Sequence, residues 1–300
     1  MKKILLLTTI ALTGSMAIAQ DNSEKEIKNV RFGLIVTPAV NWLKPDDGKI
    51  ISANGAVVKF GGGLSIEFRL AKVASIVTGI EINTMGGKVK YANGGSAAAN
   101  TNTVSYYASK SDDGVDDYLT RPDEATNYND AKYYDQTHYK FQLNEREYKA
   151  TYINIPFGIK LKTKEIGMMT YFGQVGINNN IRWKAKATDK VIELPTLDNL
   201  TGGASSTRSN VSATKEMNVY MGSLHLGAGC EMNLSGSTSL LIGVHYNLGF
   251  TSITKSESPT LEKKTNGPNY SQTNMTDYTI SKMPQAIKAN GVVLTVGILF

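Results

Sequence analysis

Two of the three histidines stand in a pattern that could support hydrolysis. His225 follows Ser223 at a spacing of two residues, and Glu231 lies further along the same stretch. Residues two apart share a face of an extended strand, so these groups could meet. A nucleophilic serine needs its base within hydrogen-bond reach, which this spacing does not require. We therefore interpret His225 and His245 as members of a polar network, and predict that the protein is not an enzyme.

An acidic string offers oxygen ligands of the kind that bind Ca²⁺. It consists of Asp112, Asp113, Asp116 and Asp117. The string lacks the remaining positions of a calcium-binding loop of the helix–loop–helix type. A solvated acidic loop is the preferred interpretation, and we predict neither a metal nor a cofactor.

The segment around this string is rich in tyrosine. Residues 105–148 hold eight Tyr, with ten acids against five bases. Because Tyr is enriched where proteins recognise partners, an envelope or secretion protein could bind through the predicted loop 92–147. The alternative is the ordinary composition of a long polar loop. If the loop serves only a partner, replacing it with a short Gly/Ser turn should leave the remaining fold intact.

The N-terminus predicts export. Residues 1–19 have two lysines, an apolar stretch and a final Ala-Ile-Ala, the pattern of a cleaved signal peptide. A retained membrane anchor is the alternative. Cleavage after Ala19 would leave residues 20–28 as a short periplasmic segment and lower the net charge from +6 to +4 by removing Lys2 and Lys3. This small excess argues against a nucleic-acid partner. Cys230 is the only cysteine, so no internal disulfide is possible.

Eight stretches alternate between an apolar face and a face of glycine and polar residues. In 58–70, Val58, Phe60 and Leu64 oppose Lys59 and Gly61. This period of two predicts strands. The eight stretches are 31–43, 58–70, 74–83, 151–161, 169–183, 220–234, 240–250 and 290–300.

The connections between these stretches alternate strictly in length. Three are short: "AKV", "TKEIG" and "SGST". The four long ones run over 44–56, 92–147, 187–217 and 254–287. In an up-and-down barrel, successive loops lie at opposite ends. The pattern is therefore that of an outer-membrane barrel, with short periplasmic turns and long extracellular loops. A soluble sandwich, with its apolar faces turned to a core, is the alternative.

We predict an all-β fold, an eight-stranded antiparallel up-and-down transmembrane β-barrel over residues 29–300. The last strand, 290–300, should pair with the first, 31–43, because an unpaired edge is not tolerated in lipid. Outer-membrane lipid should surround the apolar face. Aromatic residues near the strand ends should form its girdle at the membrane surfaces. The girdle residues are Trp42, Phe68, Tyr171, Trp183, Tyr220, Tyr246, Phe250 and Phe300.

The inward face carries both acids and bases. Eight strands enclose room only for side chains, so these charges should pair and plug the lumen. The predicted network consists of Arg31, Glu67, Arg69, Glu81, Lys160, Arg182, His225, Glu231 and His245. Inward glycines should make room for bulky neighbours such as Tyr152 and Phe172. A conducting pore is the alternative.

Several motifs resemble the PorT-like family of outer-membrane β-barrel proteins. The most telling is "YINIPFGIK" from Tyr152 to Lys160, accompanied by "YFGQVGINNNI" and the terminal "GVVLTVGILF". The resemblance implies an integral outer-membrane barrel whose C-terminal strand, with its final Phe300, is read by the barrel-assembly machinery. The founding type of the family is associated with protein secretion. The expected function is a non-enzymatic scaffold, surface-binding or secretion-associated component, and the alternative is a small transport pore or a barrel enzyme.

The barrel prediction has a direct test. A closed barrel keeps its shape in SDS until it is heated, so an unboiled sample should migrate differently from a boiled one. Identical migration, together with solubility in the absence of detergent, would instead indicate the soluble sandwich.

Overall fold

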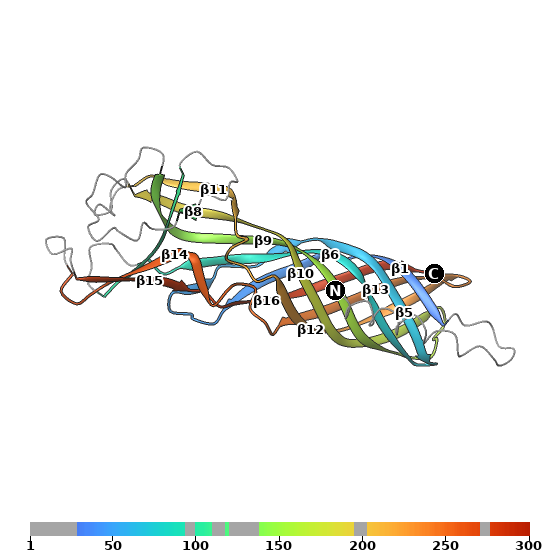
Figure 1. The fold of residues 1–300 in the computed structure, drawn as a ribbon. Coiled ribbons are helices and arrows are strands. Elements are labelled where there is room, and N and C mark those ends of the chain that lie inside the picture. The colour runs from blue at the N-terminus through green and yellow to red at the C-terminus, as the bar shows by residue number, and fades with distance from the viewer. Residues whose placement is uncertain (1–28, 94–99, 110–117, 120–137, 195–202, 271–276) are drawn as a thin grey trace, which may run out of the picture.

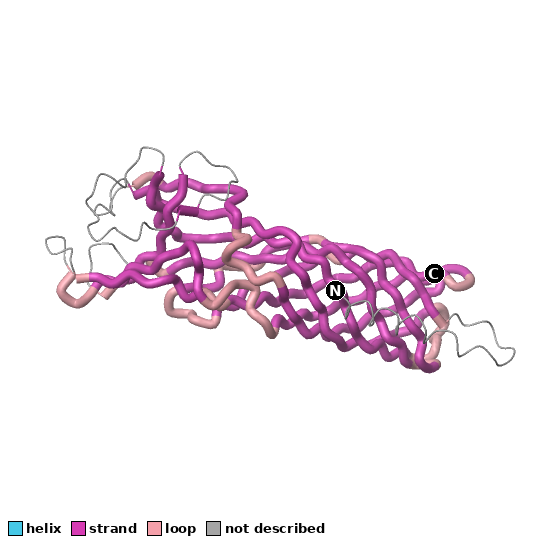
Figure 2. The backbone as a smooth tube through the Cα atoms, viewed as in Figure 1, coloured by secondary structure: helices cyan, strands magenta, loops and turns pink. Residues whose placement is uncertain are grey.

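A computed structural model describes residues 29–93, 100–109, 118–119, 138–194, 203–270 and 277–300. The predicted signal peptide and the segment 20–28 lie outside these residues. The described chain consists of strands and their connections (Figure 2). None of its segments is a helix long and apolar enough to cross a membrane.

Eight antiparallel strands of the described chain form a closed ring, as the sequence predicts (Figure 1). In ring order they are β1 (Val30–Val36), β5 (Gly61–Ala71), β6 (Ala74–Tyr91), β9 (His138–Lys162), β10 (Met169–Leu194), β12 (Tyr220–Ser235), β13 (Thr238–Gly249) and β16 (Ile287–Leu299). The three short turns lie at one end of the ring, and the long connections at the other.

The ring closes between the first and last strands. Gly33 lies opposite Leu299, and the backbone N–H groups of Phe32 and Phe300 each donate to the carbonyl of the other. The predicted strand 31–43 is interrupted at Pro38, which has no N–H to donate. It continues as β2 (Ala39–Pro45), which pairs with β16 and with the short β4 (Val57–Lys59).

The outside of the ring is an apolar band. On β9, Ile155, Phe157, Ile159 and Leu161 are all between 42 and 58% exposed. Such a row of exposed apolar side chains is expected only where lipid replaces water. Seven of the eight predicted girdle residues are exposed on this face: Phe68, Tyr171, Trp183, Tyr220, Tyr246, Phe250 and Phe300. Trp42 is half-buried, with its ring centroid 6.2 Å from that of Tyr246.

A β-bulge marks the outer rim of the band on β10. Arg182 pairs with Tyr152 and Lys184 with Thr151, so Trp183 is an extra residue without a partner on β9. An extra residue reverses the alternation of side chains along a strand. Even-numbered residues face inward up to the bulge, whereas Ala185 and the following odd-numbered residues are buried beyond it. The buried positions of β10 are therefore even-numbered before Trp183 and odd-numbered after it.

The strands continue well past this rim, which corrects the predicted loop boundaries. β6, β9 and β10 all extend outward from the barrel (Figure 1). The predicted loops 44–56, 92–147, 187–217 and 254–287 contain further strands. These are β3 (Ile51–Ala53), β7 (Asn102–Ser109), β8 (Tyr118–Leu119), β11 (Ser205–Ser212), β14 (Glu257–Asn266) and β15 (Tyr278–Pro284). The continuation of β10 is not evident from its periodicity because the bulge at Trp183 changes the phase of the alternation.

This outer part, which we call the extension, has a hydrophobic core of its own. Leu143 and Tyr148 of β9, Tyr106 of β7 and Val191 of β10 are fully buried together. The core is continuous with side chains at the barrel rim, including Tyr152 and Met221. The part of loop 92–147 that follows residue 138 is therefore structural. Replacing the whole loop would remove Phe141 and Leu143 from this core.

A buried ion cluster joins the strands of the extension. Arg146 donates to both carboxylate oxygens of Asp189 at 2.7 Å, and to Glu216 at 2.5 Å. All three side chains are 0% exposed. Tyr106 donates to Asp189 at 3.0 Å. Tyr148 lies within 3.4 Å of Glu216.

The two tyrosines complete the hydrogen bonding of the acids. Burial raises the pKa of Tyr148 and of Tyr106, so that both phenols stay protonated and can donate. Thr260 of β14 supplies another donor, to the second oxygen of Glu216. The cluster thus connects β7, β9, β10, β14 and the segment before β12.

Replacing Arg146 with Met should loosen the extension and spare the barrel. The change leaves Asp189 and Glu216 buried without their cation, which typically costs about 3–5 kcal/mol. We expect surface protease to cleave the extension of R146M, while the heat-dependent shift in SDS migration is kept. The exposed Lys190–Glu145 pair provides a matched control, because K190A should change stability by no more than about 1 kcal/mol. Equal protease resistance of R146M and wild type would contradict the assignment.

Candidate functional site in the barrel lumen

The lumen is lined by the polar face of the eight strands. On β9, Asn154 and Lys160 are 2% exposed, and they alternate with the lipid-facing Ile155 and Ile159. The same alternation turns His225 and Glu231 of β12 inward. Because a strand repeats every two residues, one apolar outer face implies one enclosed inner face. The chemistry of the barrel is therefore concentrated inside it.

An ion network blocks the lumen near the short turns. Lys160 lies 3.2 Å from Glu67 and 3.1 Å from Glu231, and it bridges the two acids. Arg31 contacts Glu231 at 2.7 Å. Lys162 contacts Glu67 at 2.5 Å and Glu231 at 2.9 Å. Arg31 also donates to Ser239 at 3.0 Å. The predicted pairing of Arg31, Glu67, Lys160 and Glu231 is confirmed.

Lys162 is also a member of this network, although it is not among the predicted residues. The predicted strand ended at residue 161, although the even-numbered alternation of β9 places Lys162 inward. With Lys162, three cations face two carboxylates. Each acid therefore contacts more than one cation, which compensates for its loss of water.

An apolar layer covers the inner side of the network. Phe172, Ile35, Leu241 and Leu299 form a buried cluster inside the ring. The ammonium of Lys160 lies 4.6 Å from the centroid of the Phe172 ring. A Cβ on Gly229 would lie 2.6 Å from this ring, so a glycine is required there. This confirms the prediction that inward glycines make room for bulky neighbours.

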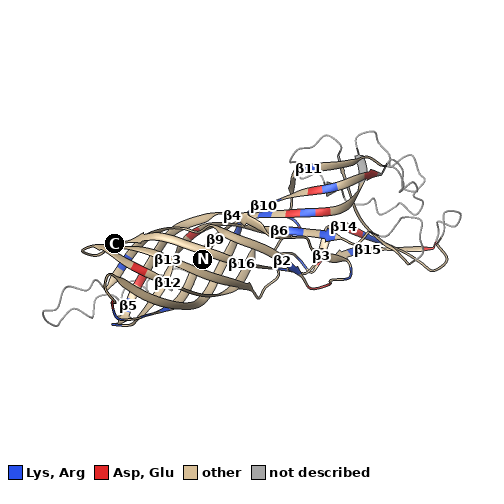
Figure 3. Ribbon diagram, turned by 180° about the vertical axis from the view of Figure 1, so that it is seen from behind, with Lys and Arg blue, Asp and Glu red and all other residues tan. Residues whose placement is uncertain are grey.

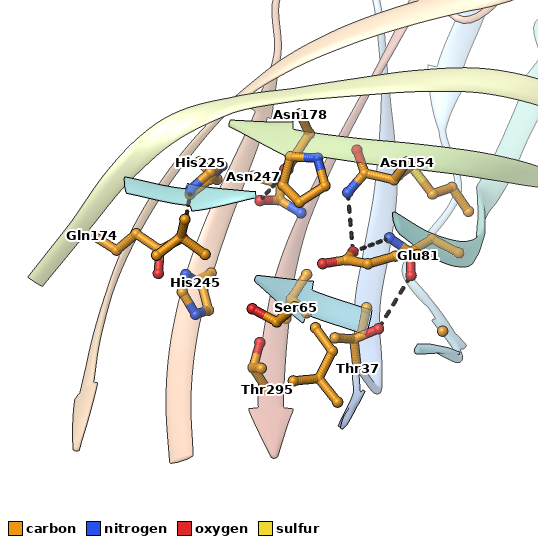
Figure 4. Close-up of a pocket in the computed structure, with 18 of the residues that line it drawn as sticks. Thr37, Ser65, Glu81, Asn154, Gln174, Asn178, His225, His245, Asn247 and Thr295 are labelled. Atoms are coloured by element: carbon orange, nitrogen blue, oxygen red, sulfur yellow. Dashed lines mark hydrogen bonds between the residues drawn. The ribbon is translucent and has the colours of Figure 1, made fainter. Parts of the chain in front are cut away.

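A polar cavity of about 90 Å³ occupies the middle of the lumen (Figure 4). Its walls come from both sides of the ring: Thr37, Asn154, His225 and Thr295 all line it. Water needs roughly 10–15 Å³ of such volume per molecule and two to four polar partners. The buried Asn154 Oδ1 and His225 Nδ1 have no hydrogen-bond partner among the residues that the structure describes. The cavity is thus suited to several water molecules or a small polar ligand.

Glu81 organises one wall of this cavity. Its Oε2 accepts hydrogen bonds from Asn83 at 2.8 Å and from Asn154 at 3.0 Å. Thr37 donates to the side-chain oxygen of Asn83 at 3.2 Å. Glu81 was predicted in the ion network, but it belongs to this separate group of amides. In the described chain it forms no ion pair within 4.0 Å.

The two lumen histidines lie on the opposite wall. The rings of His225 and His245 have centroids 6.0 Å apart in an edge-to-face arrangement. Gln174 lies 3.0 Å from His225 Nε2. Ser223 Oγ is buried and makes no hydrogen bond within the described chain. The serine and the histidine of the possible hydrolytic pattern are therefore not paired in this structure.

Arg69 and Arg182 do not join the network, and these two predictions are wrong. Arg69 lies beside the turn after β5 and donates to the carbonyls of Ala71 and Lys72. Arg182 lies at the outer rim, next to the bulge, and donates to the carbonyl of Thr214. Arg69 stands near the end of β5, and Arg182 lies within β10 beside the connection that precedes β12. Each guanidinium therefore reaches backbone carbonyls in or next to a connection. Lys59, also predicted to face inward, pairs with Glu147 at 2.8 Å.

Comparison with known families identifies the barrel. Residues 18–255, more than half of the chain, match the family described as the outer membrane protein beta-barrel domain. The chain belongs to this family. The protein is an outer-membrane β-barrel protein, located in the outer membrane as predicted. No protein in the curated collection matches the sequence.

Solved structures with detectable similarity include other outer-membrane proteins. Neisserial surface protein A is 10% identical, with a TM-score of 0.35, over 89% of this chain and 95% of that one. Ail, the attachment invasion locus protein of Yersinia pestis, is 10% identical, with a TM-score of 0.34, over 91% and 100%. OprG from Pseudomonas aeruginosa is 11% identical, with a TM-score of 0.33, over 90% and 94%. Identities of this size carry no information on a shared role.

The described residues contain no group of three or more His, Cys, Asp or Glu that could hold a metal ion. The acidic string Asp112, Asp113, Asp116 and Asp117 lies outside the described residues. Most of the Tyr-rich segment does so as well.

Substituting Gln for Glu231 should destabilise the barrel. The change removes the carboxylate that Arg31, Lys160 and Lys162 share and leaves buried cations underpaired, which typically costs about 3–5 kcal/mol. We expect the folded form of E231Q in SDS to convert to the migration of the boiled protein at a lower temperature than wild type does. K288Q, which removes one member of the partly exposed Lys288–Asp46 pair, serves as the control and should behave as wild type. An unchanged transition for E231Q would contradict the network.

Proposed function

We propose that this protein is a non-enzymatic surface-binding barrel whose extension presents a binding platform outside the membrane. The observation that carries the proposal is the continuation of β6, β9 and β10 beyond the apolar band, around a core and a buried ion cluster of their own. A span across the bilayer needs only about 9–11 residues per strand, whereas β9 has 25 and β10 has 26. The additional length builds structure in the extracellular space.

The lumen favours a scaffold over a pore. The network of Arg31, Glu67, Lys160, Lys162 and Glu231 fills the ring near the turns, and the apolar layer around Phe172 lies above it. Ions crossing the barrel would have to displace both. The lumen histidines support the non-enzymatic part of the proposal, since His225 contacts Gln174 and not Ser223.

An envelope or secretion protein is the partner class that we assign to the platform. The resemblance to PorT-like proteins supports this choice. The "YINIPFGIK" strand that carries the resemblance is part of the barrel wall, with Ile155 and Phe157 toward lipid and Asn154 toward the lumen. The motif therefore serves to build the barrel wall. Because its side chains face lipid or the lumen, we assign the recognition of a partner to the platform.

Two measurements test the proposal. In planar bilayers, we expect the purified protein to give no single-channel steps, and discrete steps would favour the transport alternative. In native outer membranes, purification in gentle detergent should yield a stoichiometric partner by mass spectrometry. That partner should be lost from R146M, in which the extension is loosened.

The matched control changes the lumen and leaves the extension untouched. H245N removes an imidazole at the lumen cavity, far from the ion cluster of Arg146. We expect H245N to retain the partner. Loss of the partner from H245N but not from R146M would assign binding to the barrel and contradict the platform.

A further inference from the structure

A row of three lysines lies where the barrel leaves the apolar band. On β9 the outward residues change from Ile153 through Thr151 to Lys149. On β10, Lys184 directly follows the bulged Trp183, and Lys186 comes two residues later. Lys149 and Lys184 are exposed, and Lys186 is half-buried. In Figure 3 the charged positions gather beyond the barrel and at its turn end, and most of the wall between them is tan, the colour of the uncharged residues.

The strand register brings these lysines together. Lys149 lies directly opposite Lys186, and Lys184 lies opposite Thr151, the next outward residue of β9. On its other side, Lys149 pairs with Gly86 of β6, which carries no charge. Like charges directly opposite each other destabilise an antiparallel pair. The arrangement is therefore unfavourable unless an anion approaches it.

The described chain does not supply that anion. Lys186 donates to the side-chain oxygen of Asn210 at 3.0 Å, which leaves its charge uncompensated. Within the described residues, no carboxylate oxygen lies within 4.0 Å of the ammonium of Lys149, Lys184 or Lys186.

Two lysines that lie further from the membrane, Lys88 and Lys190, do have carboxylate partners. Lys88 lies 3.8 Å from Glu147, which Lys59 also contacts. Lys190 lies 2.9 Å from Glu145, and this hydrogen bond lowers the pKa of Glu145. Carboxylates thus lie beside Lys88 and Lys190, which stand further out. They are absent from the row that stands next to the membrane.

We propose that Lys149, Lys184 and Lys186 bind the phosphate groups of lipids in the outer leaflet. The depth of the row selects this occupant. Trp183 is 69% exposed at the same rim, and exposed aromatic residues at a rim mark the level of the headgroups. Lysine ammonium groups on long stems reach toward anionic headgroups at that level. A phosphate between the strands would remove the repulsion between Lys149 and Lys186.

The test is a lipid titration of the full-length barrel in detergent, followed by native mass spectrometry. The probe is diphosphoryl lipid A, with dephosphorylated lipid A as its uncharged counterpart. We expect the variant K149Q/K184Q/K186Q to bind the phosphorylated probe about tenfold or more weakly than wild type, because each surface lysine adds favourably to anionic-lipid binding. Wild type should prefer the phosphorylated probe by a similar factor.

The control variant K88Q/K90Q/K190Q removes the same number of charges from the outer rows. It should bind the probe within about twofold of wild type, and heat-dependent SDS migration should verify the folding of both variants. Equal losses in the two variants, or equal binding of the two probes, would overturn the proposal. Displacement of the lipid by millimolar inorganic phosphate would assign the row to free phosphate and would equally refute a lipid site.

Discussion

The pairing of every backbone polar group inside the apolar band is the constraint on which this structure depends. In lipid, no water is present to form a hydrogen bond with an unpaired N–H or C=O group, so the sheet must close. The closure is visible in the hydrogen bonds between Phe32 and Phe300, at opposite ends of the described chain. Once the sheet is closed, the alternation of each strand separates a lipid face from a lumen face.

The lumen and the extension solve the same problem of buried charge in different ways. Near the turns, three cations share the two carboxylates Glu67 and Glu231. In the extension, one cation, Arg146, holds the two carboxylates Asp189 and Glu216. Each cluster joins strands that are distant in the sequence. Both therefore fix which strands lie together.

The sequence was sufficient to predict the ring, because one face of each strand is almost uninterruptedly apolar. It was not sufficient for the extension. There the outward face turns to charged residues, and the alternation changes phase at the Trp183 bulge and again where Lys190 and Val191 pair with Glu145 and Leu143. The buried Arg146 could have been found by continuing the inward positions of β9 backwards through Ala150 and Tyr148. Arg69 and Arg182 were misplaced because alternation does not show which backbone carbonyls of nearby connections lie within reach of a guanidinium.

The long pairing of β9 with β10 has a mechanical consequence. Their register runs from Phe172 opposite Lys162, beside a short turn, to Leu194 opposite Lys140 in the extension. At about 3.3 Å per residue, the two strands form one ribbon roughly 80 Å long. A pull on the extension acts along both strands in the same direction. The hydrogen bonds that join the ribbon to β6 and β12 are therefore loaded together in shear and do not break one after another. The extension is thereby anchored in the bilayer along the whole length of this ribbon, and a tension applied to it is distributed over many hydrogen bonds.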